Sequence, residues 1–142
     1  MTTENDREST GSPAQLMVQE VWSRGDLQLI DDLVTEDYVH YDVALPKPIR
    51  GPEAFKETVA MFREGTPDLT KAIKETIVDG NTVVIPYTAT GTHKGEILGV
   101  APTDTEIEVE GMFVYRVEDG CLVEGTDLWN AFGLLCQIGE VN

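Results

Sequence analysis

The feature that most constrains the fold is a change in hydrophobic period near the middle of the chain. Up to Gly65, apolar residues recur at the spacing of amphipathic helices. Beyond Asp68 they alternate with polar residues, as they do in half-buried strands. Helices followed by a run of adjacent strands favour an α+β fold, because a βαβ fold would intersperse the two periods. The 142 residues suffice for a single domain with a sizeable core.

Helix signals divide the first half of the chain. Ser12 is predicted to cap a first helix that Gly25 ends, and Asp26 to cap a short second helix. A short strand is expected around residues 38–41, and a third helix is expected to open at Gly51. These helices would carry apolar faces toward a common core.

The second half of the chain predicts long strands joined by tight turns. The Asp-Gly pairs within 79–81 and 118–120 are typical of hairpin turns. Pro86 lies inside a predicted strand and has no N–H to donate, so a bulge or an edge position is expected there. The predicted strand ranges are 70–78, 82–93, 105–118 and 121–131.

The chain is strongly acidic, with 26 Asp and Glu against 10 Lys and Arg and a net charge of −16. Salt screens the repulsion between such charges, so this balance favours a protein adapted to high salt over an ordinary acidic one. Nucleic acid and anionic membranes are excluded as partners, because binding phosphates requires a basic surface. Glu106, Glu108 and Glu110 alternate with apolar residues and form an acidic stripe on one face of the predicted sheet.

Composition also bounds the location and the chemistry. No apolar run approaches the ~20 residues that span a bilayer, and no secretion signal precedes the first helix, so a cytoplasmic location is expected. The polar, acidic residues 1–11 are predicted to be a flexible segment ahead of one domain at 12–142. Cys121 and Cys136 are predicted to be free thiols, and no His or Cys occurs at metal-ligand spacing, so no metal is expected.

Two ionisable residues fall on apolar alternations and are therefore candidates for acid/base chemistry. His93 shares the alternation of Ile85 and Tyr87, and it could be a base or a strand-end histidine bonded to backbone. Glu75 shares the alternation of Ile73 and its neighbours, where desolvation would raise the pKa of the carboxyl. The alternative for Glu75 is a twisted or bulged strand that exposes this side chain to water.

Three segments of the last third resemble the SnoaL-like polyketide cyclase and ester cyclase group of the nuclear transport factor 2-like superfamily. They are residues 91–95 (GTHKG), 119–124 (DGCLVE) and 133–139 (GLLCQIG). The resemblance implies a curved antiparallel sheet wrapped by N-terminal helices around a cone-shaped pocket. It further implies a small apolar organic ligand, proton transfer beside a carbonyl without metal or cofactor, and a homodimer.

The same resemblance implies where the site residues lie. Asn130 occupies the position of the acid/base aspartate, and Thr126 that of a tryptophan. An amide can hold a carbonyl oxygen but cannot shuttle a proton, so His93 or Glu75 would carry it, with Glu124 a weaker candidate. Asp127 would lie on the opposite face from Asn130 by strict alternation, unless a bulge intervenes.

Aromatic and polar residues along the first strand and the pocket-facing positions are the expected substrate contacts. Tyr41 and Asp42 align with a His-Asp pair of the group, with His40 beside them. Three functions stay open: a cyclase, isomerase or hydrolase acting on a small carbonyl or ester compound, a binding or carrier module, and an interaction domain. The predicted substrate-binding residues are Trp22, His40, Tyr41, Asp42, Tyr87 and Trp129.

Overall fold

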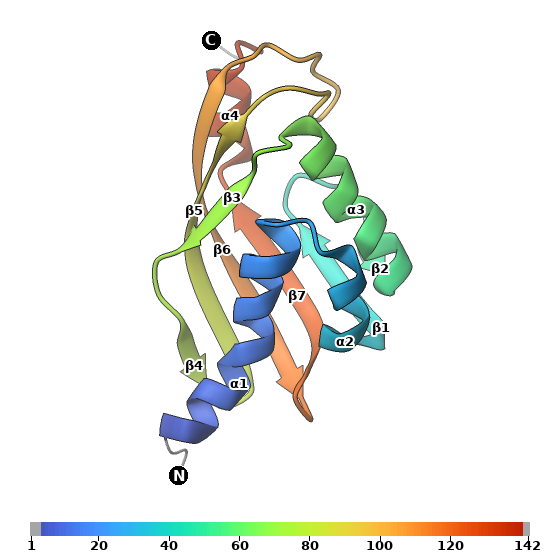
Figure 1. Cartoon of the computed structure of the whole chain (residues 1–142), viewed down its shortest axis with the longest axis vertical. Helices are drawn as coiled ribbons and strands as arrows, with labels where there is room; N and C mark the ends of the chain where they lie inside the picture. The colour runs from blue at the N-terminus through green and yellow to red at the C-terminus, as the bar shows by residue number, and fades with distance from the viewer. Residues whose placement is uncertain (1–3, 141–142) are drawn as a thin grey trace.

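The computed structural model describes residues 4–140, in which helices pack on one face of a seven-stranded sheet (Figure 1). This is the α+β fold that the change of period predicts. The helical elements are α1 (Glu4–Leu16), η1 (Met17–Trp22), η2 (Leu27–Leu29), α2 (Ile30–Leu33), α3 (Pro52–Gly65) and α4 (Ala131–Gln137). The strands are β1 (Val34–Asp42), β2 (Ile49–Arg50), β3 (Thr70–Ile73), β4 (Ile77–Asp79), β5 (Thr82–Thr92), β6 (Glu106–Glu118) and β7 (Cys121–Trp129).

The first helix is longer than the sequence predicts. It begins at Glu4 instead of Ser12, runs through Pro13, and continues into the π-helical turn η1. Ser12 does not cap it, because its hydroxyl donates to the Glu8 carbonyl one turn earlier at 2.8 Å. The segment 1–11, which the sequence predicts to be flexible, is helical from residue 4, and residues 1–3 lie outside the described range. The apolar face of α1 and η1 buries Ala14, Met17, Val18, Val21 and Trp22.

The first helical segment ends, and the next two begin, where the turn and capping residues predict. Gly25 has φ of +78°, a left-handed conformation that ends the helix. The Asp26 carboxylate accepts the Leu29 N–H at 3.4 Å and so caps η2. Helix α3 opens with Pro52 at its first turn, where the missing N–H costs nothing.

The sheet is mixed, although the sequence predicts an antiparallel one. Its strand order is β2-β1-β7-β6-β5-β3, with β4 also pairing with β5. Strand β1 pairs parallel with β7, and the other neighbours are antiparallel. Local alternation cannot reveal this pairing, because β1 and β7 lie at opposite ends of the sequence.

Two predicted strands are interrupted. The expected strand at 70–78 is divided into β3 and β4, which pair with different parts of β5. Ile85 and Pro86 have no strand partner on that side, so Pro86 lies at a local edge and its missing donor is harmless, as its sequence position predicts. The expected strand at 121–131 ends at Trp129, and the short helix α4 follows it.

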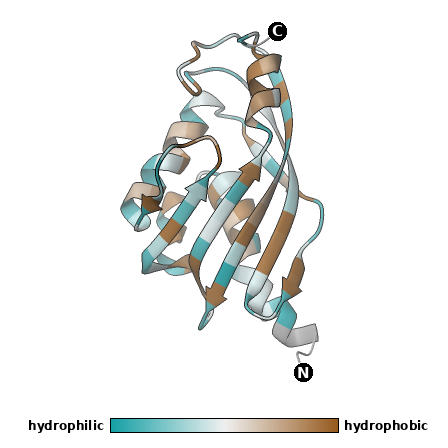
Figure 2. Ribbon diagram, turned by 180° about the vertical axis from the view of Figure 1, so that it is seen from behind, coloured by the Kyte–Doolittle hydropathy of each residue, from teal (hydrophilic) through white to brown (hydrophobic). Residues whose placement is uncertain are grey.

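The two faces of the sheet differ in what covers them. Helices α1, α2 and α3 lie across one face, where the core gathers, and Figure 2 shows the opposite face free of them. That outer face carries the exposed acidic stripe of Glu106, Glu108 and Glu110. It also exposes Met112 and Leu128, which are register partners. Among residues 4–140, no helix is long and apolar enough to cross a membrane.

Candidate functional site

A cavity lies between the helices and the inner face of the sheet. It comprises about 470 Å³ of space between the atoms, part of it open to solvent. Its wall is mainly apolar, with a few polar groups, which is the usual composition of a site for a small organic ligand. The lining residues are Trp22, Asp42, Phe62, Thr66, Leu69, Lys71, Tyr87, Ala89, Ile97, Ile107, Val109, Asp127, Trp129 and Leu134.

Asp127 is a buried carboxylate on β7 that faces this cavity. It is 1% exposed. The Tyr87 hydroxyl donates to its Oδ1 at 2.7 Å, and the Lys71 ammonium donates to its Oδ2 at 3.3 Å. Burial, followed by the charge of Asp127, raises the pKa of Tyr87, so its hydroxyl stays a donor. The carboxylate is therefore held between a neutral and a cationic donor.

A β-bulge explains why Asp127 faces inward. Opposite the neighbouring residues Arg116 and Val117 of β6, strand β7 places Glu124 and Leu122, so Val123 is an extra residue. The extra residue shifts the alternation of everything that follows it. Leu122 is buried before the bulge, and after it the inward positions are 125, 127 and 129.

Lys71 on β3 lies deep in the cavity wall. Its side chain is 7% exposed, and its Nζ lies 3.6 Å from the ring centroid of Trp22. The rings of Phe113 and Tyr87 lie at 4.8 and 4.9 Å. Its backbone N–H donates to the Ser23 hydroxyl at 2.9 Å, which joins β3 to the end of η1. Burial lowers the pKa of this amine, and the carboxylates of Asp127 and Asp42 oppose that effect.

Asp42 provides a second buried carboxylate at the end of β1. It is 6% exposed, and its Oδ1 accepts the Ala44 N–H at 2.8 Å and the Trp129 indole N–H at 2.9 Å. Burial raises the pKa of Asp42, and the charge of Asp127 adds to this rise. The two hydrogen bonds and the Lys71 charge partly oppose it. Asp42 therefore takes up a proton more readily than an ordinary aspartate.

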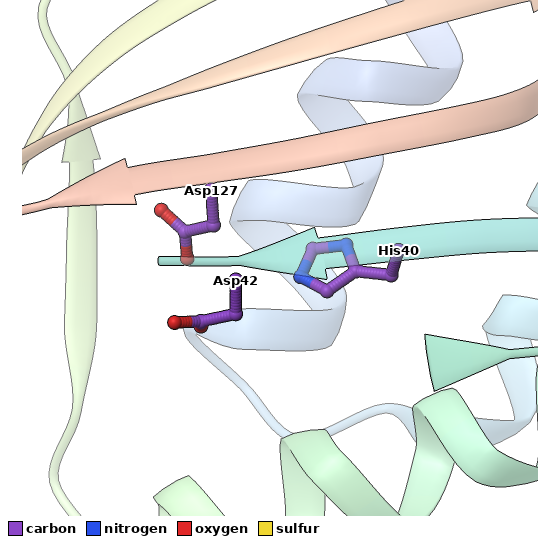
Figure 3. A group of neighbouring side chains, drawn as sticks. All are labelled: His40, Asp42 and Asp127. Atoms are coloured by element: carbon purple, nitrogen blue, oxygen red, sulfur yellow. The ribbon is translucent and has the colours of Figure 1, made fainter. Parts of the chain in front are cut away.

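His40 lies beside these two carboxylates on β1. Figure 3 shows its ring next to Asp42 and Asp127, and one donor atom from each residue lies within 4.8 Å of the others. The ring is fully buried, with Nδ1 3.1 Å from the Tyr38 hydroxyl and Nε2 without a partner among the described residues. Burial, with the charge of Lys71, lowers the pKa of His40 to about 3, so the imidazole is neutral near pH 7.

An imidazole and two carboxylates are also a donor set that divalent metals accept. Here, however, the Lys71 ammonium lies against Asp127 and supplies positive charge to the group. A buried set of two carboxylates and one amine suits proton transfer and the stabilisation of a negative oxygen.

Gly111 on β6 provides the space that the Tyr87 side chain needs. A Cβ atom at Gly111 would lie 2.4 Å from the Tyr87 hydroxyl oxygen and ring. Gly111 is the register partner of Tyr87 across the β5–β6 ladder. The Tyr87 ring therefore lies over a residue without a side chain, and its hydroxyl reaches Asp127.

The structure brings together most of the predicted substrate-binding residues. The cavity wall includes Trp22, Asp42, Tyr87 and Trp129, and His40 is buried beside Asp42. Tyr41 does not join them: it is 39% exposed, because it alternates with His40 and Asp42 along β1. The indole of Trp129 packs edge-on against Phe62, with ring centroids 6.0 Å apart.

The structure does not bring Asn130, His93 and Glu75 together in this cavity. Asn130 is exposed, and its side chain caps α4 by accepting the Gly133 N–H at 2.8 Å. His93 is fully buried at the end of β5, where its ring is bonded to Thr103 at 2.9 Å and to the Val100 carbonyl at 3.3 Å. Glu75 is exposed in the break between β3 and β4, where the alternation with its neighbours is lost.

Sequence reasoning missed Lys71 and undervalued Asp127. Lys71 lies on the same alternation as Glu75 and Ile73, and it precedes the break that turns Glu75 outward. That alternation was thus a usable signal for Lys71. For Asp127 the available signal was Asn130 itself, because asparagine is a favoured helix cap and the apolar residues after it follow helical spacing.

Comparison with known proteins shows the family and the fold. The nogalonic acid methyl ester cyclase of Streptomyces nogalater is 26% identical over 111 residues, which cover 74% of this chain and 83% of that protein. A structure assigned to the SnoaL-like polyketide cyclases, from Jannaschia sp. CCS1, superposes with a TM-score of 0.87 at 20% identity, covering 94% of each chain.

A protein of Catenulispora acidiphila with a ketosteroid isomerase-like fold, solved in complex with trimethylamine, has a TM-score of 0.77 at 17% identity. The superposition covers 98% of this chain and 95% of the Catenulispora acidiphila chain. The family model of the SnoaL-like polyketide cyclases matches residues 12–138, nearly the whole described range. The chain therefore belongs to the SnoaL-like polyketide cyclase family.

Proposed function

We propose that this protein is a cofactor-free cyclase that acts by proton transfer on a small apolar carbonyl or ester compound. The observation that carries the proposal is the presence of two buried carboxylates, Asp42 and Asp127, and one buried amine, Lys71, in an otherwise apolar cavity. Ionisable groups buried in the wall of an apolar cavity are typical of sites that transfer protons.

Asp42 is the better proton carrier of the two carboxylates. Its hydrogen bonds come from neutral donors, the Ala44 N–H and the Trp129 indole. Its raised pKa brings it toward the range in which a general base and acid works near neutral pH. Asp127 instead contacts the Lys71 ammonium, and this contact fixes the position of the cation.

Lys71 and the apolar wall then stabilise the negative charge that develops on the carbonyl oxygen of the substrate. When Asp42 takes a proton from the carbon beside a carbonyl, negative charge moves to the carbonyl oxygen, and the Lys71 ammonium stabilises it. The carbon attacks a second carbonyl of the same molecule, forming the new C–C bond. Asp42 returns the proton to the resulting alkoxide, so no atom is gained or lost.

The wall of the cavity supports the same reaction. Leu69, Ile107 and Val109 are buried side chains that would contact the carbon skeleton of the substrate. An apolar wall strengthens the attraction between the buried Lys71 ammonium and the negative oxygen, because little solvent is present to screen this attraction. The relative from Streptomyces nogalater is named for cyclising a methyl ester, which agrees with a carbonyl or ester substrate.

The carrier alternative rested on Asn130 standing in place of an acid/base aspartate. Asn130 is a helix cap outside the cavity, and the cavity has carboxylates of its own. That reason for preferring a binding module is therefore removed.

The test is enzyme-catalysed exchange of the acidic C–H of a β-keto ester with deuterium, measured above the buffer rate by NMR. Asp42→Asn should lower the catalysed rate by about 10²–10⁴-fold, the usual contribution of a positioned acid/base. Glu75→Gln and Asn130→Asp are the controls, and both should exchange at the wild-type rate. Loss of exchange in Glu75→Gln with retention in Asp42→Asn would contradict the assignment.

A further inference from the structure

The amine that lines the cavity can do more than stabilise charge. We propose that Lys71 forms a covalent iminium with a ketone group of the substrate, so that the attacking carbon is that of an enamine. This inference rests on the proposed function only in its choice of a carbonyl substrate. It assigns Lys71 a nucleophilic role in place of a purely electrostatic one.

The position of Lys71 distinguishes it from the other lysines of the chain. Its side chain is buried in the cavity wall, with one carboxylate contact at 3.3 Å. Lys56 is paired with both Asp31 and Glu53, Lys74 with Glu110, and Lys94 with Asp104. These three lysines form their four ion pairs at the surface, and Lys47 is exposed. Among residues 4–140, Lys71 is the only lysine that lines this mainly apolar cavity.

The environment of Lys71 favours a free amine as a reactant. Burial lowers the pKa of Lys71, whereas hydrogen bonds to carboxylates raise the pKa of Lys56 and Lys94. A lysine desolvated among apolar side chains is the usual form of an amine that attacks a carbonyl. Asp127, 3.3 Å away, is placed to accept the proton that the amine must lose.

The aromatic rings around Lys71 suit the intermediate as well as the resting state. The Trp22, Phe113 and Tyr87 rings surround Nζ with centroids at 3.6–4.9 Å. An iminium carries the same positive charge as an ammonium, at the same nitrogen. The rings that stabilise one therefore stabilise the other, and the total charge of the cavity does not change, because Asp127 gains a proton and Asp42 gives one up.

The step balances with the groups that are present. Asp127 accepts one proton from the Lys71 ammonium. The neutral Nζ then attacks the carbonyl carbon, the N–C bond forms as the C=O π bond opens, and a proton moves from this nitrogen to the oxygen to give a carbinolamine. Asp42, which holds a proton readily, donates it as the C–O bond breaks and water leaves. The Asp42 carboxylate then removes a proton from the adjacent carbon, giving the enamine that forms the C–C bond. Asp42 gives its proton to the alkoxide that the new C–C bond creates, and it then takes a proton from the water that attacks the product iminium. The resulting carbinolamine collapses to the ketone, and Asp127 returns its proton to the freed Lys71 amine.

The probe for this inference is acetylacetone, a β-diketone that condenses with an amine to a vinylogous amide with loss of water. The wild-type protein should develop the near-ultraviolet absorption of that amide. Peptide mass mapping should place the adduct, the mass of the diketone less water, on Lys71. Labelling there should be faster than at any other lysine, because burial lowers the pKa of Lys71 and leaves more of this amine in its free form.

Two variants separate the chemistry from folding. Lys71→Arg keeps a cation beside Asp127 but cannot condense, so it should give no absorption while its circular dichroism matches the wild type. Lys74→Arg, an exposed position just beyond the same strand, should label as the wild type does. A wild-type adduct spread evenly over the lysines would overturn the inference. That outcome is read from the wild-type protein by mass mapping, so it does not depend on whether either variant folds.

The exchange and labelling assays fail in different ways. Deuterium exchange that depends on Asp42 without any adduct on Lys71 would overturn the iminium and leave the proposed proton transfer intact. An adduct confined to Lys71 without exchange or cyclisation would support the reactive amine and remove the cyclase proposal. Absence of both would overturn both.

Discussion

Replacing Lys71 with methionine tests how far the buried carboxylate depends on its cation. Asp127 is 1% exposed and has two side-chain partners, the Tyr87 hydroxyl and the Lys71 ammonium. Lys71→Met keeps the volume of the side chain but leaves Asp127 with the neutral partner alone. Removing one member of a buried ion pair typically costs about 3–5 kcal/mol. Solvent screening does not reduce this figure, because both side chains are almost fully buried.

The free energy of unfolding should be measured by urea denaturation in molar KCl, where the large net charge is screened. Lys74→Met is the matched control, because it removes an equal charge from an exposed pair and should cost at most about 1 kcal/mol. The double variant Lys71→Met/Asp127→Asn removes both charges and should be more stable than Lys71→Met alone. If the double variant instead loses the sum of the two single losses, the two groups are not coupled and the reasoning fails.

Three further predictions concern the pH profile, salt and assembly. Trp129→Phe removes a hydrogen bond that opposes the rise in the pKa of Asp42. Because the base must be deprotonated, the rise of kcat/KM with pH should move to higher pH in this variant, and an unmoved profile would exclude Asp42 as the base. The net charge of −16 predicts that the thermal unfolding temperature rises between low salt and molar KCl, and a transition insensitive to KCl would contradict salt adaptation. The exposed Met112 and Leu128 on the outer face of the sheet predict a homodimer, which Met112→Glu should weaken. Light scattering that gives the 15.6 kDa of one wild-type chain would refute the dimer.

Much of the fold could be predicted because local chemistry determines it. Gly25 and Asp26 end and begin helices by their own backbone preference and hydrogen bonding, whatever packs around them. The Asp-Gly turns lie where expected, with positive φ at Gly80 and Gly120. The β5 alternation also holds, because a half-buried strand must place every second side chain in the core.

The candidate site could be predicted only in part, because its geometry depends on pairings between distant segments. Asp42 and Trp129 meet through the parallel pairing of β1 with β7, which no local pattern encodes. The break between β3 and β4 exposes Glu75. The position of that break is set by the separate pairing of β3 and of β4 with β5. The resemblance placed the acid at Asn130, but the capping bond to Gly133 holds that side chain outside the cavity.

The single extra residue Val123 has a consequence for how homologous sequences are compared. Counting from either end of β7 gives opposite answers as to which residues point inward, since Leu122 and Asp127 are both buried although they lie an odd number of positions apart. A relative that lacked Val123 would keep the equivalent of Asp127 inward, because the ladder around the bulge would simply become regular. A relative with the same number of residues but no bulge would instead turn the equivalent of Leu128 toward the cavity and the equivalent of Asp127 toward solvent. The cavity of that relative would present an apolar side chain at the position where this cavity has the Asp127 carboxylate, although the flanking sequence could be the same. Assigning a functional role to an aligned residue beyond Val123 therefore requires the strand register as well as the sequence alignment.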